Sequence, residues 1–240
     1  MSLETALRAT EILLALALLQ QSLEHIFWAR AERRTFFIRA ALAIVLLTGW
    51  QSIWVLAALT AQSVVLLHRF GGAYNGGSDR LALLILFCLT AASFLPPGCG
   101  REVAFGYLAL QVLLSYVVSG QVKIANAAWR RGQALADVFA FSAYPVSQQV
   151  RGLHRFSGLM RAASWAVMTL ELLLPLALIS RETLLLALGC ALAFHLANAI
   201  LFGLNRFLWI WPAGYPALLW LQGLVDPLVG WHAPTMFWGG

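Results

Sequence analysis

Of the 16 lysine and arginine residues in the chain, only Lys123 is a lysine. It ends the sequence SGQVK (119–123), directly after an apolar run that begins at Val103. Arginine keeps its proton in proteins, whereas a desolvated lysine can lose its proton and act as a base. A lysine at the end of a membrane span can also simply extend to water as an anchor. Because every other such position is arginine, Lys123 is a candidate catalytic base.

Two other ionisable residues stand inside apolar runs, where a charge is costly and is by default a candidate for function. Glu171 is followed by Pro175, which cannot donate a hydrogen bond to the Glu171 carbonyl. We therefore expect a kink and a free acceptor beside this carboxylate, which suits a proton or cation site. His195 precedes Asn198 by three residues, so both side chains should share one helix face.

A purely structural role is also open for these residues. Glu171 and His195 could pair with each other, or with Arg161 or Lys123, as polar contacts between helices. Catalysis predicts that Lys123 is neutral in a dry cleft, with Glu171 or His195 as its proton partner. Cysteine and histidine show no spacing typical of a metal site, so no metal is expected.

The composition indicates whether lipid or water surrounds these residues. Hydrophobic residues make up 61% of the chain, charged residues 11%, and the mean hydropathy is +0.78. These values predict an all-α integral membrane protein with one domain over residues 1–240. The net charge of +6 comes from arginines near the ends of the apolar segments, where they contact lipid head groups, and we expect no binding of nucleic acid.

The apolar segments predict a polytopic helical bundle of about eight spans. Residues 36–67 are too long for one crossing, because at about 1.5 Å per residue they would exceed a core of about 30 Å. GWQS (49–52) near the middle favours a hairpin of two short spans. The other spans are expected at 5–28, 81–95, 103–122, 159–179, 183–204 and 207–224.

Residues 124–158 are the longest stretch between spans, and they remain partly apolar. We expect an interfacial helical segment that lies on the membrane or dips into it. Basic residues accumulate in alternate loops, at 30–39, at 69–80 and at 123–161. The positive-inside rule places these loops in the cytoplasm, so the chain is expected to be a multi-pass protein of a bacterial cytoplasmic (inner) membrane.

The segment YVVSGQVKIANAAWRRG (116–132) resembles the small-Gly-x-x-Lys-Leu…Trp…Gly stretch of the vitamin K-dependent gamma-glutamyl carboxylases. Those enzymes share a membrane domain with bacterial horizontally transferred transmembrane domain proteins. YNGGSDR (74–80) and FGLNRF (202–207) also resemble sequences of that bacterial group, and the likeness extends from about Arg30 to Leu219.

The resemblance implies a specific chemistry. In the carboxylases, the lysine that matches Lys123 deprotonates reduced vitamin K, and oxygen then converts the quinol to a strong base. That base removes a proton from a glutamate side chain before carbon dioxide adds. Here the spacing from Lys123 to Trp129 is one residue longer, and the chain has no large soluble domain. Quinol chemistry is therefore expected more than carboxylation of a protein.

Three functions follow from these observations. The first is an enzyme acting on a quinol or another lipid-soluble substrate, with Lys123 as the base and no cofactor expected beyond such a quinol. The second is a non-catalytic accessory or assembly subunit of a larger electron-transfer or photosynthetic membrane complex. The third, a small-molecule transporter, is supported only by Glu171 and Pro175.

Overall fold

The computed structural model describes residues 1–28, 32–69, 77–142 and 148–229, and within these ranges every regular element is a helix. The longer helices in chain order are α1 (Leu3–Trp28), α2 (Arg33–Thr48), α3 (Ser52–Arg69), α4 (Gly77–Phe94), α5 (Cys99–Ala125), α9 (Ser157–Leu173), α10 (Arg181–Phe202), α11 (Asn205–Ala213) and α12 (Tyr215–Val229). The short elements are α6 (Ala127–Arg130), α7 (Gln133–Phe141), α8 (Gln148–Gly152), and the 3₁₀ helices η3 (Leu153–Arg155) and η4 (Leu174–Ile179).

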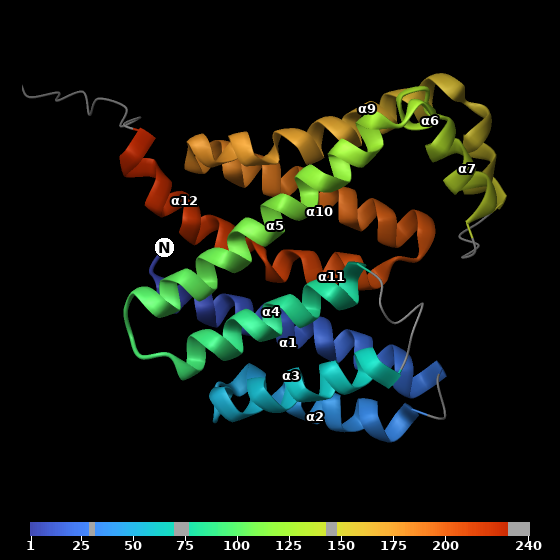
Figure 1. The fold of residues 1–240 in the computed structure, drawn as a ribbon. Coiled ribbons are helices and arrows are strands. Elements are labelled where there is room, and N and C mark those ends of the chain that lie inside the picture. Colours follow the sequence, from blue (N-terminus) through green and yellow to red (C-terminus); the bar gives the residue numbers. More distant parts are fainter. Residues whose placement is uncertain (29–31, 70–76, 143–147, 230–240) are drawn as a thin grey trace, which may run out of the picture.

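The predicted hairpin is present as two helices, and α2 packs against α1 while α3 packs against α2 and α4 (Figure 1). Gly49 ends α2 in the left-handed conformation, with a φ of 78°, and its N–H bonds to the Leu46 carbonyl. The guanidinium of Arg8 donates to the carbonyls of Leu46 and Leu47 at 2.9 and 2.6 Å. The last turn of α2 is thus satisfied by a side chain from α1, as helix ends require.

Four of the described helical segments are long and apolar enough to cross a membrane: α4, α5, α9 with η4, and α10. Residues Ser52–His68 form a shorter apolar helix. The structure therefore supports a multi-pass helical protein, while the number of eight spans stays a prediction. The large apolar side chains on the outer faces of these helices, Leu186 at 71% exposed for example, are suited to contact lipid.

The last predicted span, 207–224, is wrong as a single helix, because α11 ends at Ala213 and α12 begins at Tyr215. Pro212 and Pro216 lie on either side of the break, and neither can supply the N–H that a continuous helix needs. The irregularity expected at Pro175 is present, since α9 changes into the 3₁₀ helix η4 at Leu174.

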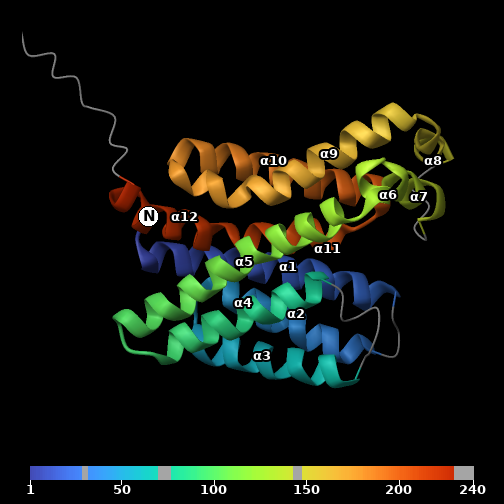
Figure 2. The ribbon, with the colours of Figure 1, turned by 45° about the horizontal axis from the view of Figure 1, so that its top comes forward.

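The ends of α1, α3 and α5 and the starts of α2, α4 and α9 lie at the same end of the bundle (Figures 1 and 2). The loops that the sequence marks as basic therefore lie together, although Arg30 and residues 70–76 are outside the described residues. At that end, α6, α7 and α8 confirm that the segment 124–158 is helical where it is described. Its placement in the interface stays a prediction.

Candidate functional site

A cavity of about 460 Å³ lies between α4, α5, α9, α10 and α11. It is lined by all three residues singled out in the sequence, Lys123, Glu171 and His195, although they come from three different helices. Asn198 also lines it, so the expected shared face with His195 is confirmed. The other lining residues are Gly77, Arg80, Leu81, Leu84, Ser115, Tyr116, Ser119, Phe194, Leu204, Phe207 and Trp211.

Lys123 forms an ion pair with Glu171 at one end of this lining. Its Nζ lies 2.7 Å from both carboxylate oxygens and also donates to the hydroxyl of Ser119. The Ser119 hydroxyl in turn donates to Glu171 Oε1 at 3.1 Å. The side chains are 17% exposed for Lys123 and 4% for Glu171, so water screens this pair weakly. The sequence left several partners open for Glu171, and in the structure its partner is Lys123.

Gly120 allows α5 and α9 to approach each other at the level of the ion pair. A Cβ built on Gly120 would lie 2.8 Å from Leu172 Cγ and 3.1 Å from Glu171 Cβ. Both distances are shorter than normal contact, so any side chain would push α9 away from α5. The serine and glycine before Lys123 thus have separate roles: Ser119 bonds to both charges, and Gly120 provides the space.

Trp129 covers Lys123 from outside the cavity. Its ring centre is 5.5 Å from the ammonium nitrogen, within the range of a cation–π interaction. The short helix α6 that carries Trp129 begins at Asn126, whose side chain accepts a hydrogen bond from the N–H of Ala128. The guanidinium of Arg130 donates to the carbonyls of Ile124 and Ala125, which end α5. The turn after Lys123 is therefore firmly tied to the helix that carries it.

His195 does not pair with Glu171 but with Tyr116, which the sequence reasoning missed. The Tyr116 hydroxyl lies 2.8 Å from His195 Nε2 and 3.4 Å from the Tyr215 hydroxyl. The imidazole stacks on Trp211, with ring centres 5.0 Å apart and planes at 14°. His195 Nδ1 is buried and has no hydrogen-bond partner among the described residues. The cavity thus has a second polar position, which is formed by an imidazole and a phenol.

A signal for the missed residues is present in the sequence. Tyr116 and Ser119 precede Lys123 by seven and four residues, which places all three on one face of a helix. Tyr116 lies about 10 Å from Lys123 along the axis, at about 1.5 Å per residue. The contributions of Arg80 and Trp211 could not be found in this way, because they come from α4 and α11.

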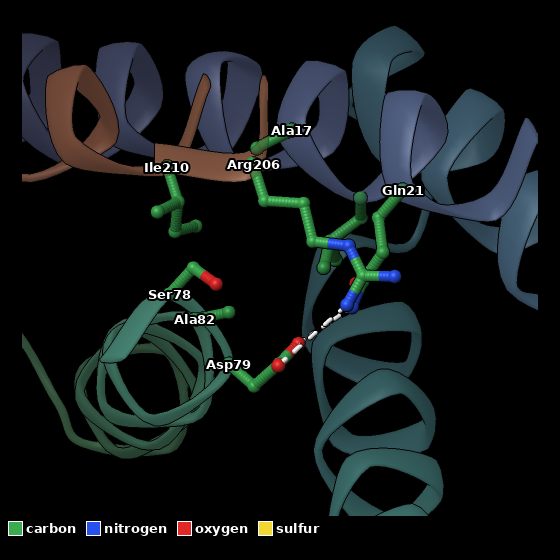
Figure 3. A pocket seen from close by; sticks show the side chains of 8 residues that line it. Ala17, Gln21, Ser78, Asp79, Ala82, Arg206 and Ile210 are labelled. Atoms are coloured by element: carbon green, nitrogen blue, oxygen red, sulfur yellow. Dashed lines mark hydrogen bonds and ion pairs between the residues drawn. The ribbon is translucent and has the colours of Figure 1, made fainter. Parts of the chain in front are cut away.

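A second polar cluster holds the starts of α4 and α11 against α1 (Figure 3). Gln21 donates to Asp79 Oδ1 at 2.6 Å, and Arg206 lies 3.7 Å from Asp79 Oδ2 and 3.4 Å from Glu24. The enclosed space here is only about 10 Å³, room for about one water molecule. The cluster fixes the starts of α4 and α11 in place. The residues that follow Asp79 and Arg206 in the sequence, Arg80 and Phe207, line the large cavity.

A family match agrees with this arrangement. The HTTM domain matches residues 103–219, a range that includes Lys123, Glu171, His195 and Tyr116. Residues 103–219 are therefore similar to the HTTM domain. This is the transmembrane domain found in vitamin K-dependent carboxylases and related proteins, so the resemblance is confirmed. The match begins at residue 103, whereas the likeness was expected to begin near residue 30.

No curated protein and no solved structure matches the chain. Among the described residues, no group of three or more histidine, cysteine, aspartate or glutamate side chains could hold a metal ion.

Proposed function

We propose that this protein is a membrane enzyme in which Lys123 removes a proton from a hydroxyl group of a quinol or a similar lipid-soluble substrate. The observation that supports this most directly is the contact between Lys123 and Glu171 in the wall of a cavity of about 460 Å³. Cavities that bind small molecules typically measure about 300–1,000 Å³ and have mostly apolar walls with a few polar groups. Leu81, Leu84 and Trp211 provide such apolar surface here.

The proton step needs Lys123 in its neutral form. In the resting protein Lys123 and Glu171 form an ion pair. A bound apolar substrate that excludes water from the cavity would disfavour the separated charges and favour transfer of the lysine proton to Glu171. The neutral amine can then accept the proton of a substrate hydroxyl, which leaves a phenolate beside the ammonium of Lys123. The ammonium stabilises that negative charge, and the neutral Glu171 no longer competes for it.

The pair of His195 and Tyr116 provides the second polar position. The two groups are 2.8 Å apart, and His195 Nδ1 has no hydrogen-bond partner among the described residues. Either group can hydrogen-bond a second polar atom of the substrate, so the substrate would be held at two points along α5. A quinol has two hydroxyl groups on an apolar ring, and these would match the two polar positions and the apolar walls of the cavity.

The decisive experiment compares Lys123→Met and Lys123→Arg with the parent protein. Quinol turnover is measured in the membrane-embedded full chain, with circular dichroism as the check of fold. Loss of a general base should lower the rate by about 10²–10⁴, and Lys123→Arg should not restore it because arginine retains its proton. Turnover by the methionine variant at the parent rate would refute the proposal.

The competing proposal is an accessory or assembly subunit of a larger electron-transfer or photosynthetic complex. It is favoured by one observation: Glu171 and Ser119 already bind Lys123, as in a purely structural contact between helices. Native mass spectrometry with lipid extraction separates the two proposals. Stoichiometric protein partners would favour the subunit, and a solitary chain carrying quinone would favour the enzyme. Uptake assays in loaded vesicles test the remaining possibility, a transporter.

The proposed location is the bacterial cytoplasmic (inner) membrane, with the end that carries α6, α7 and α8 in the cytoplasm. This orientation follows from the arginines near that end of the bundle, including Arg33, Arg80 and Arg131. A cysteine introduced at Arg131, in a variant whose three native cysteines are replaced by alanine, is labelled with an impermeant reagent on intact and on opened cells. Labelling in intact cells would contradict the proposed orientation.

A further inference from the structure

Exposed arginines gather on the surface formed by residues 127–142 and 148–161, called here the arginine platform. Arg131, Arg155 and Arg161 are exposed, and none of them forms an ion pair among the described residues. Asp137 is the one carboxylate in the sequence from residue 127 to residue 161, so the platform has a clear positive excess. A cluster of unpaired cations needs either water or an anionic partner.

The platform is rigid because its inner face is anchored to the bundle. Phe139 of α7 packs with Met160 of α9 and Phe202 of α10 in a small apolar cluster. Gly132 has a φ of 79°, and a Cβ built on it would lie 2.5 Å from the backbone nitrogen of Arg161. The turn after Arg131 is thus pressed against the first turns of α9, which fixes Arg131 near Arg161.

Large apolar side chains accompany these arginines on the outer face. Phe141 is 79% exposed and Phe156 is 62% exposed, although both would be buried in a water-soluble protein. Leu159, at 51% exposed, follows on the first turn of α9. Arginine beside exposed aromatic and aliphatic side chains is the composition of a surface that lies in the head-group region of a bilayer.

We propose that the arginine platform binds the phosphate groups of anionic phospholipids in the surrounding leaflet. Guanidinium groups bind phosphate with two parallel hydrogen bonds, and Phe141 and Phe156 enter the acyl boundary beside them. The platform also adjoins Lys123, because the Trp129 ring on α6 lies 5.5 Å from the Lys123 ammonium nitrogen. A bound head group therefore holds the turn that covers Lys123.

The test uses the full chain in a neutral detergent and a fluorescent phosphatidylglycerol, with unlabelled phosphatidylglycerol or phosphatidylcholine as competitors. Arg161→Gln is compared with Arg181→Gln, because both arginines are exposed in the first turns of neighbouring helices and Arg181 lies at the opposite end of the bundle. A triple variant replaces Arg131, Arg155 and Arg161 together. Thermal unfolding followed by circular dichroism verifies that each variant is folded.

We expect phosphatidylglycerol to compete well and phosphatidylcholine poorly. Each arginine removed from the platform should weaken binding about five-fold, and the triple variant should weaken it on the order of 100-fold. Arg181→Gln should bind like the parent. Three results would each overturn the proposal. They are an equal loss of binding in Arg161→Gln and Arg181→Gln, unchanged binding by the triple variant, and equal competition by the two lipids. Lys123→Met should retain the lipid preference, so this test is independent of the proposed enzyme activity.

Discussion

Removal of one member of the pair formed by Lys123 and Glu171 should destabilise the protein far more than removal of both. Lys123→Met leaves a carboxylate that is 4% exposed and keeps only the Ser119 hydroxyl as a partner. A buried charge that loses its partner costs about 3–5 kcal/mol. Glu171→Leu leaves an ammonium that is 17% exposed and still faces Trp129, so its cost should be at the lower end, about 3 kcal/mol.

The double variant, Lys123→Met with Glu171→Leu, has no charge at this position. Replacing a buried ion pair by apolar residues of similar volume is often neutral, so we expect the double variant within about 1 kcal/mol of the parent. The effects of the two single variants should therefore differ strongly from additivity, with a coupling energy of about 3 kcal/mol or more.

The free energy of unfolding can be measured in mixed micelles by titration with a denaturing detergent, with circular dichroism as the signal. A matched control is the pair of Arg101 and Glu4, which is similar in length at 2.8 Å but has a carboxylate side chain that is 68% exposed. Glu4→Gln should cost less than about 1 kcal/mol. If the double variant instead lost as much stability as the two single variants together, the charges would not be coupled and the reasoning would be refuted.

Two further variants examine the geometry around this pair. Gly120→Ala forces a Cβ against α9 and should lower the free energy of unfolding by about 1–3 kcal/mol, measured by the same titration. The control is Gly189→Ala on the outer face of α10. A Cβ at Gly189 has no atom within 4 Å, so this variant should be neutral or slightly stabilising. Tyr116→Phe leaves His195 Nε2 buried without its 2.8 Å partner and should cost about 1–3 kcal/mol in the same measurement.

The control for Tyr116→Phe comes from the same helix. Tyr107→Phe, on the exposed side of α5, should change stability by less than about 0.5 kcal/mol. Equal effects in Tyr107→Phe and Tyr116→Phe would mean that the contact with His195 contributes nothing. A neutral Gly120→Ala would show that α5 and α9 are not in close contact at this level.

Periodicity and composition predicted the helical membrane fold because apolar segments must satisfy their own backbone hydrogen bonds in lipid. The hairpin between α2 and α3 was predictable from segment length and from GWQS (49–52). The break at Gly214 was missed, since Pro212 and Pro216 were read as part of one continuous span. Proline effects on a helix depend on whether neighbouring groups satisfy the freed carbonyls, and this is a tertiary property.

The sequence by itself identified Lys123, Glu171 and His195, because an ionisable side chain in an apolar run is costly wherever the run folds. Helical spacing also puts Tyr116 and Ser119 on the face of Lys123, a local signal that was present in the sequence but was missed. Only the tertiary structure decided which partner each residue takes. The close approach of α9 to α5 at Gly120 brings Glu171 to Lys123, and the packing of α10 against α9 and α11 brings His195 to Tyr116. Pairing between helices depends on their relative positions, which side-chain packing across the whole bundle determines.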